Sequence, residues 1–143
     1  MVNIDYIMNL FDWNNSDENQ NRGLELAKDV KCISVFIQPG SPYGKNVWDN
    51  CAKALARKDD KELEPHLIAL LEWLQDMNWP GAFCILDRLQ KYKDDIYLDL
   101  CLTICLRKAK TLDDETWEYN LNMLKKNNKT GNKTGDGSMY CSQ

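Results

Sequence analysis

The stretch "LLEWLQDMNWPGAFCILDRL", residues Leu70 to Leu89, decides the fold of this chain. Its apolar residues recur at three- and four-residue spacing on both sides of an Asn-Trp-Pro-Gly junction, a period typical of amphipathic helices. The pattern predicts one helix from about Pro65 to Met77 and a second from Trp79 to about Leu89. A link this short makes the two helices antiparallel neighbours, an αα-hairpin.

The junction itself consists of Asn78, Trp79, Pro80 and Gly81. Asn is a good N-cap, and Pro is tolerated in the first turn of a helix because its missing amide has no partner there. Gly81 removes a side chain at a point where two backbones can approach each other. These residues favour a tight packed corner, and direct ligand binding is the alternative.

Helical periodicity extends over most of the remaining chain, so we expect an all-α fold. The segment from Asp95 to Lys108 is apolar almost all round, which predicts a central helix buried on most sides. Residues Cys32 to Ile37 are either an extended connector or a short helix, since β-branched residues there precede a Pro- and Gly-rich run.

The helical pairs predict the domain organisation. Trp79 and Trp117 are separated by about one HEAT repeat length, which favours a short HEAT-like α-solenoid of antiparallel helix pairs. An irregular helical bundle is the alternative. Residues 1–126 form the expected single domain, and the polar, Gly-rich residues 127–143 form a flexible tail.

The composition excludes several classes of protein. The formal net charge of −4 argues against a nucleic-acid binder, which usually carries a basic patch. No apolar run is long enough to cross a membrane, and no export signal is visible, so we expect a cytoplasmic protein. In that compartment the core-like Cys51, Cys84, Cys101 and Cys105 are expected to be reduced packing residues.

The sequence contains no catalytic signature. It has one histidine, His66, and lacks a phosphate-binding loop, a zinc-binding CxxC pair and a helical His-Glu zinc motif. We therefore predict no catalytic residues, no cofactor and no metal. Carboxylates are numerous, and in most cases such residues line solvated helix faces and helix N-termini.

Four segments carry a resemblance to a known family: Ser34 to Pro39, Asn46 to Lys53, Glu62 to Pro65, and Leu70 to Ala82. Together they resemble a family of uncharacterised bacterial proteins that share a domain of unknown function. The resemblance implies a small helical, HEAT-like fold and no known enzymology. Proteins of this kind are suspected of serving as immunity proteins beside bacterial toxins.

Two functions remain. The first is a non-enzymatic protein-binding module of the immunity-protein kind, whose acidic, aromatic-flanked face captures a protein partner such as a basic toxin domain. The second is a small carboxylate-dependent enzyme that uses carboxylates between Glu62 and Asp76, assisted by His66. The candidate binding residues are Glu62, Glu64, His66, Glu72, Trp73, Asp76 and Trp79.

Overall fold

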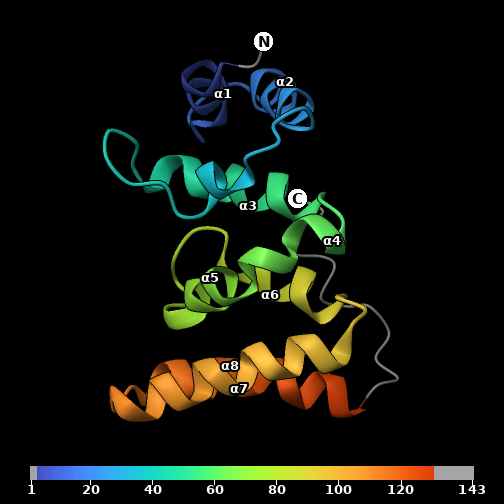
Figure 1. Ribbon diagram of the computed structural model, residues 1–143. Coiled ribbons are helices and arrows are strands. Elements are labelled where there is room, and N and C mark those ends of the chain that lie inside the picture. The colour runs from blue at the N-terminus through green and yellow to red at the C-terminus, as the bar shows by residue number, and fades with distance from the viewer. Residues whose placement is uncertain (1–2, 131–143) are drawn as a thin grey trace.

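The computed structural model describes residues 3–130, with side chains for residues 3–124, and the described residues form helices and no strand (Figure 1). The fold is therefore all-α, as predicted. The α-helices are α1 (Ile4–Phe11), α2 (Asp17–Ala27), α3 (Trp48–Ala56), α4 (Asp60–Leu63), α5 (Leu67–Glu72), α6 (Ala82–Gln90), α7 (Asp95–Thr111) and α8 (Glu115–Thr130). The 3-10 helices are η1 (Ile33–Phe36), η2 (Lys45–Val47), η3 (Glu64–His66) and η4 (Trp73–Gln75). The flexible tail predicted for residues 127–143 lies outside the described residues except for 127–130, which end α8.

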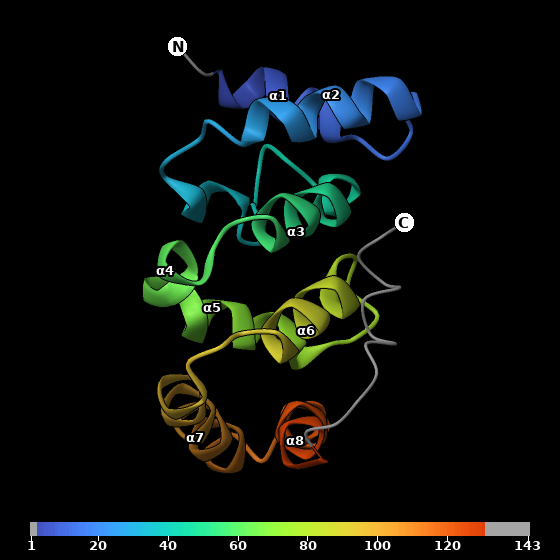
Figure 2. The same cartoon turned by 90° about the vertical axis from the view of Figure 1, so that its right-hand side faces the viewer.

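The helices are stacked in successive layers along the chain (Figures 1 and 2). Helices α1 and α2 form the first layer, α3 the second, α4 to α6 the third, and α7 and α8 the last. The segment left open between an extended connector and a helix is η1, which lies beside α3.

A single apolar core runs through all four layers, from Ile7 in α1 to Leu124 in α8. Its largest fully buried side chains are Trp73 and Trp117, followed by Phe11 and Phe36. Each layer is too thin to bury its apolar residues alone, so each helix pair depends on the next layer for its stability.

Side chains from a later element cap the carboxyl ends of earlier helices. Asn50 of α3 donates to the carbonyl of Phe11 at the end of α1, and Asn120 of α8 donates to the carbonyl of Leu74. Since the last carbonyls of a helix have no partner within it, these bonds satisfy groups that burial between layers would otherwise leave unpaired.

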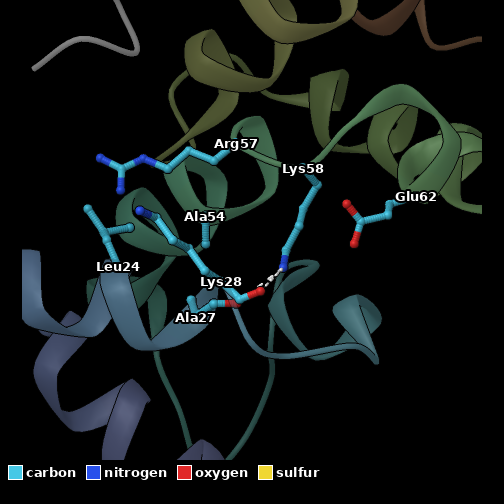
Figure 3. Close-up of a pocket in the computed structure, with 7 residues that line it drawn as sticks. All are labelled: Leu24, Ala27, Lys28, Ala54, Arg57, Lys58 and Glu62. Carbon is cyan, nitrogen blue, oxygen red and sulfur yellow. Dashed lines mark hydrogen bonds between the residues drawn. The ribbon is translucent and has the colours of Figure 1, made fainter.

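Lys58 performs the same role for α2 with a buried charge (Figure 3). Its ammonium donates to the carbonyls of Ala27, Lys28 and Val30 at 3.2, 3.2 and 3.1 Å, and the residue is only 7% exposed. The carbonyl end of a helix carries partial negative charge, which explains how Lys58, with no ion pair among the described residues, is stabilised there.

The prediction that Asp95 to Lys108 forms a central helix buried on most sides is wrong. Helix α7 belongs to the last layer (Figure 2). Its residues Ile96, Leu100 and Ile104 are exposed. Only one face of α7, containing Leu98 and Leu102, faces the core. Apolar composition alone does not distinguish a helix surrounded by other helices from one with an uncovered apolar face.

The prediction that Cys84 is a reduced packing residue is also wrong, because Cys84 is disulfide-bonded. Cys51, Cys101 and Cys105 are buried free thiols as predicted, and Cys32 is free and exposed. The difference arises because a disulfide requires two sulfurs to be brought together by the fold, which spacing along the chain does not determine.

Candidate functional site

The Asn-Trp-Pro-Gly junction is a turn whose polar groups bond to one another. The carboxylate of Asp76 accepts from the amide of Asn78 at 2.9 Å, and the carbonyl of Asp76 accepts from the amide of Trp79 at 3.0 Å. The predicted cap and helix start are wrong. Helix α6 begins at Ala82 with Gly81 in the N-cap position, and Pro80 lies in the turn before it.

Gly81 has a φ of 86°, in the left-handed region that glycine adopts without strain. A Cβ at this position would lie 2.7 Å from the Cβ of Ala52 and 3.0 Å from the carbonyl oxygen of Trp48. The predicted close approach of two backbones at Gly81 is therefore confirmed, with α3 as the neighbouring element.

Three tryptophans fix the corner against α3. Trp73 is fully buried, and its indole N–H donates to the carbonyl of Pro80 at 3.0 Å. The ring of Trp48 meets those of Trp73 and Trp79 edge-on, each at a centroid distance of 5.9 Å. Trp79 is half-buried, so it closes the edge of this cluster. The geometry accounts for all three rings as packing residues.

The predicted binding residues are distributed over different structural roles. Glu62 forms a capping box with Asp59 at the start of α4, and Glu72 forms an ion pair with Lys108 at 2.6 Å. Glu64 is exposed, and His66 is half-buried. Asp76 lies outside the regular helix predicted from Pro65 to Met77, because η4 ends at Gln75 and Asp76 is extended.

Within this set the structure gives Glu64 a distinctive environment. Tyr92 is buried, and its pKa is raised by burial and then by the charges of Glu64 of η3, Asp60 of α4 and Asp94 before α7. Tyr97 lies next to this group, and its pKa is raised by Cys101, by burial and by Glu64. We call these five residues, Asp60, Glu64, Tyr92, Asp94 and Tyr97, the acidic–tyrosine surface.

Asp60 is the most strongly held member of the acidic–tyrosine surface. Its carboxylate accepts from the guanidinium of Arg88 at 2.6 Å and from the amide of Lys93 at 2.9 Å. Burial raises the pKa of Asp60, but these two hydrogen bonds and the nearby positive charges outweigh it, so the pKa is lowered overall. Arg88 also donates to the carbonyls of Ala56 and Lys58, which joins α6 to the end of α3.

The sequence analysis missed Asp60, Tyr92, Asp94 and Tyr97 as members of one surface. They come from the start of α4, the end of the α6 hairpin and the start of α7. The available signal was the pair of Asp94 and Asp95 directly after the basic segment Lys91 to Lys93, which marks a helix start. Which earlier helix lies beside that start depends on the fold.

A small pocket between α2, α3 and α4 has a charged lining (Figure 3). It has a volume of about 130 Å³ and is bordered by Lys28, Arg57, Lys58 and Glu62. The donors of Lys58 are already used by the carbonyls of the α2 end, and the side chain of Glu62 accepts from the amide of Asp59. The pocket brings no pair of carboxylates together with a histidine.

Over residues 3–124, no group of three or more histidine, cysteine, aspartate or glutamate side chains is placed to hold a metal ion. In the same part of the chain no helix combines the length and apolar character required to cross a bilayer.

No curated protein and no solved structure matched the chain. A domain family did: the domain of unknown function DUF5071 matches residues 44–134, from η2 to beyond the end of α8. This range contains the corner formed by Trp48, Trp73 and Trp79, and it contains the acidic–tyrosine surface. Since the match covers more than half of the sequence, the chain belongs to the DUF5071 family, a domain of unknown function.

Proposed function

We propose that this protein is a non-enzymatic protein-binding module that captures a basic protein partner through the acidic–tyrosine surface. The observation that carries the proposal is that the carboxylate of Asp60 accepts from the amide of Lys93, which brings the start of α4 beside the start of α7, where Glu64 and Asp94 add negative charge. The exposed carboxylate of Glu64 makes no hydrogen bond or ion pair among the described residues, so its charge is available to a partner.

Charge and tyrosine together suit a protein partner. Carboxylates attract a basic surface and accelerate the encounter, and the effect is screened over about 10 Å at 0.1 M salt. Tyr92 is buried and Tyr97 half-buried, so the contact with a partner falls to Tyr97. Tyrosine is enriched at interfaces because its ring provides apolar contact and its hydroxyl a hydrogen bond. The basic partner we favour is a bacterial toxin domain, which makes this chain an immunity protein.

The architecture supports the same proposal. We interpret the stacked layers as a short HEAT-like solenoid in which α5 with α6 and α7 with α8 are antiparallel pairs. Solenoids offer extended surfaces for binding other proteins, and successive layers contribute side chains to one surface. The acidic–tyrosine surface is built in this way. Asp60 and Glu64 come from the third layer, and Asp94 and Tyr97 from the last layer.

The alternative, a small carboxylate-dependent enzyme, has less support. Glu62 and Glu72 have capping and ion-pair partners, and His66 makes no hydrogen bond or ion pair among the described residues. In such an enzyme a catalytic carboxylate or histidine reaches the proton that it transfers, and a second group commonly orients it by a hydrogen bond. No such pair involves His66 in this part of the chain.

The test uses the product of the adjacent gene as the candidate partner. Co-expression of the two proteins should restore growth if that product is toxic, and the complex should co-purify at low salt. The Glu64→Lys variant should slow association by about tenfold because one attractive charge becomes repulsive. The Glu18→Lys variant, an equal charge change on exposed α2 in the first layer, is the matched control and should leave the rate nearly unchanged.

Equal effects of the Glu64 and Glu18 variants would assign the attraction to net charge and remove the acidic–tyrosine surface as the binding site. Turnover of a small substrate by the purified chain, abolished by His66→Ala, would replace the binding proposal with the enzymatic one.

A further inference from the structure

Helix α7 carries an uncovered apolar stripe at the end of the stack. Ile96, Leu100 and Ile104 recur at four-residue spacing and are 85%, 57% and 44% exposed. Helices α5 and α8 cover the opposite side of α7, and no described helix lies beyond it (Figure 2). The terminal layer of a stacked helical protein normally presents a polar outer face, so this stripe requires a separate explanation.

The part of the chain outside the structure is poorly suited to cover the stripe. Residues 131–143 read GNKTGDGSMYCSQ, in which Met139 and Tyr140 are the only large apolar residues. The stripe itself spans three apolar side chains over two helical turns. Another protein surface of matching length is the better occupant.

Charged side chains along the same face of α7 indicate that the matching surface is a second copy of this chain. Asp95 and Asp99 lie toward the amino-terminal end of α7, and Arg107 lies toward the carboxyl-terminal end. None of these three side chains makes a hydrogen bond or ion pair among the described residues, although all three are exposed. The exposed face of α7 is therefore negative in its amino-terminal half and positive near its carboxyl end, with Leu100 and Ile104 between Asp99 and Arg107.

A helix face with this order of charges is complementary to a second copy of itself that runs antiparallel to it. If two copies of α7 cross antiparallel about Thr103, Asp99 of each copy lies level with Arg107 of the other, four residues from the centre in both cases. Thr103 is exposed and small, so it permits close approach at the centre. A parallel pairing would instead place Asp99 beside Asp99 and Arg107 beside Arg107.

We propose that the protein forms a two-fold symmetric homodimer through an antiparallel pairing of α7. The two copies bury Leu100 and Ile104 close to the two-fold axis, with Ile96 at the edge of the interface, and form two symmetry-related Asp99–Arg107 ion pairs. A two-fold interface uses the same patch on both subunits, which this charge pattern requires. The inference does not depend on the acidic–tyrosine surface or on a toxin partner.

One helix from each chain provides an interface at the small end of the specific range, so we expect a concentration-dependent dimer. Analytical ultracentrifugation of the full chain over about 1–300 µM should show a monomer–dimer equilibrium. The Leu100→Asp variant should raise the dissociation constant at least about tenfold, because it places a charge in the buried stripe. Tyr6→Asp, an exposed aromatic on α1 in the first layer, is the matched control and should dimerise normally.

Charge exchange tests the geometry independently of apolar contact. Asp99→Arg and Arg107→Asp should each weaken the dimer, since each places like charges level with one another. The double variant Asp99→Arg with Arg107→Asp should restore dimerisation. Far-UV circular dichroism confirms that each variant is folded.

Three results would overturn the proposal: a monomer at every concentration, a dimer unaffected by Leu100→Asp, or a double exchange that fails to restore association. If Leu100→Asp left a monomeric protein monomeric but abolished capture of the toxin partner, the stripe would be assigned to that partner. Glu64→Lys tests the acidic–tyrosine surface separately, so the two proposals can fail independently.

Discussion

Replacement of Gly81 by alanine should destabilise the protein strongly, because the new methyl group has neither a permitted backbone conformation nor space. The φ of 86° places residue 81 in the left-handed region, which costs an L-residue about 1–2 kcal/mol. The added Cβ would lie 2.7 Å from the Cβ of Ala52, well inside the optimal carbon–carbon separation of about 3.5–4.0 Å.

The neighbours of this methyl group cannot move easily. One is the backbone carbonyl of Trp48 at 3.0 Å, and another is the buried ring of Trp73 at 3.0 Å. Overpacking a core position typically costs about 1–3 kcal/mol. Together with the backbone term, Gly81→Ala should lower the free energy of unfolding by about 2–5 kcal/mol, a large part of the roughly 5–15 kcal/mol typical of a domain.

Urea denaturation followed by circular dichroism measures this difference, provided that the slope of the transition is unchanged. Gly40→Ala is the matched control, because a Cβ at Gly40 meets nothing within 4 Å and its φ is not in the left-handed region. Its free energy of unfolding should lie within about 0.5 kcal/mol of the parent protein. Equal stabilities of the Gly81→Ala and parent proteins would refute the assignment of this corner as the contact that fixes α6 against α3.

Three further predictions follow from buried or charged groups. Lys58→Met should lower the free energy of unfolding by about 2–4 kcal/mol because three carbonyls lose their donor, whereas Lys28→Met, on an exposed side chain, should have little effect by thermal denaturation. Asp60→Asn should cost about 1–2 kcal/mol at pH 7. Because the pKa of Asp60 is lowered in the folded state, its contribution is complete above about pH 4 and is lost as the pH falls through the folded pKa, so parent and variant stabilities should converge in acid. Thiol titration in denaturant should recover two fewer thiols before reduction than after it, because Cys84 is disulfide-bonded; equal counts would contradict this. In the native state Cys32 should react faster than Cys51 and Cys105, since burial raises the pKa of Cys51 and raises that of Cys105 to about 11.

Local sequence was sufficient where a structural feature depends on neighbours along the chain. The spacing of Leu67, Leu70 and Leu74 was enough to predict an amphipathic helix, and all three are buried. Gly81 could be assigned a close contact because its missing side chain is a property of one residue. The predicted N-cap was wrong by three residues, since both Asn78 and Gly81 are acceptable at a helix N-cap and only packing against α3 selects Gly81.

The candidate site lay beyond the reach of local patterns. Asp60, Glu64 and Asp94 gather around Tyr92 because the hairpin of α5 and α6 returns the chain to the start of α4. Charge density along the sequence indicated acidic surfaces, but carboxylates close in sequence, such as Glu62 and Glu72, acquired different partners in the fold.

The sequence by itself determined that this chain is helical and that its Asn-Trp-Pro-Gly junction is a corner, because helical period and turn chemistry act over a few residues. Only the tertiary structure decided that α7 is a terminal helix with an exposed apolar stripe and that Cys84 forms a disulfide. Apolar periodicity specifies that a face is able to be buried, whereas the number and positions of the neighbouring helices determine whether it is buried. For the same reason, a thiol in the core can be predicted from its neighbours in sequence, but a bond between two sulfurs requires their proximity in the folded chain.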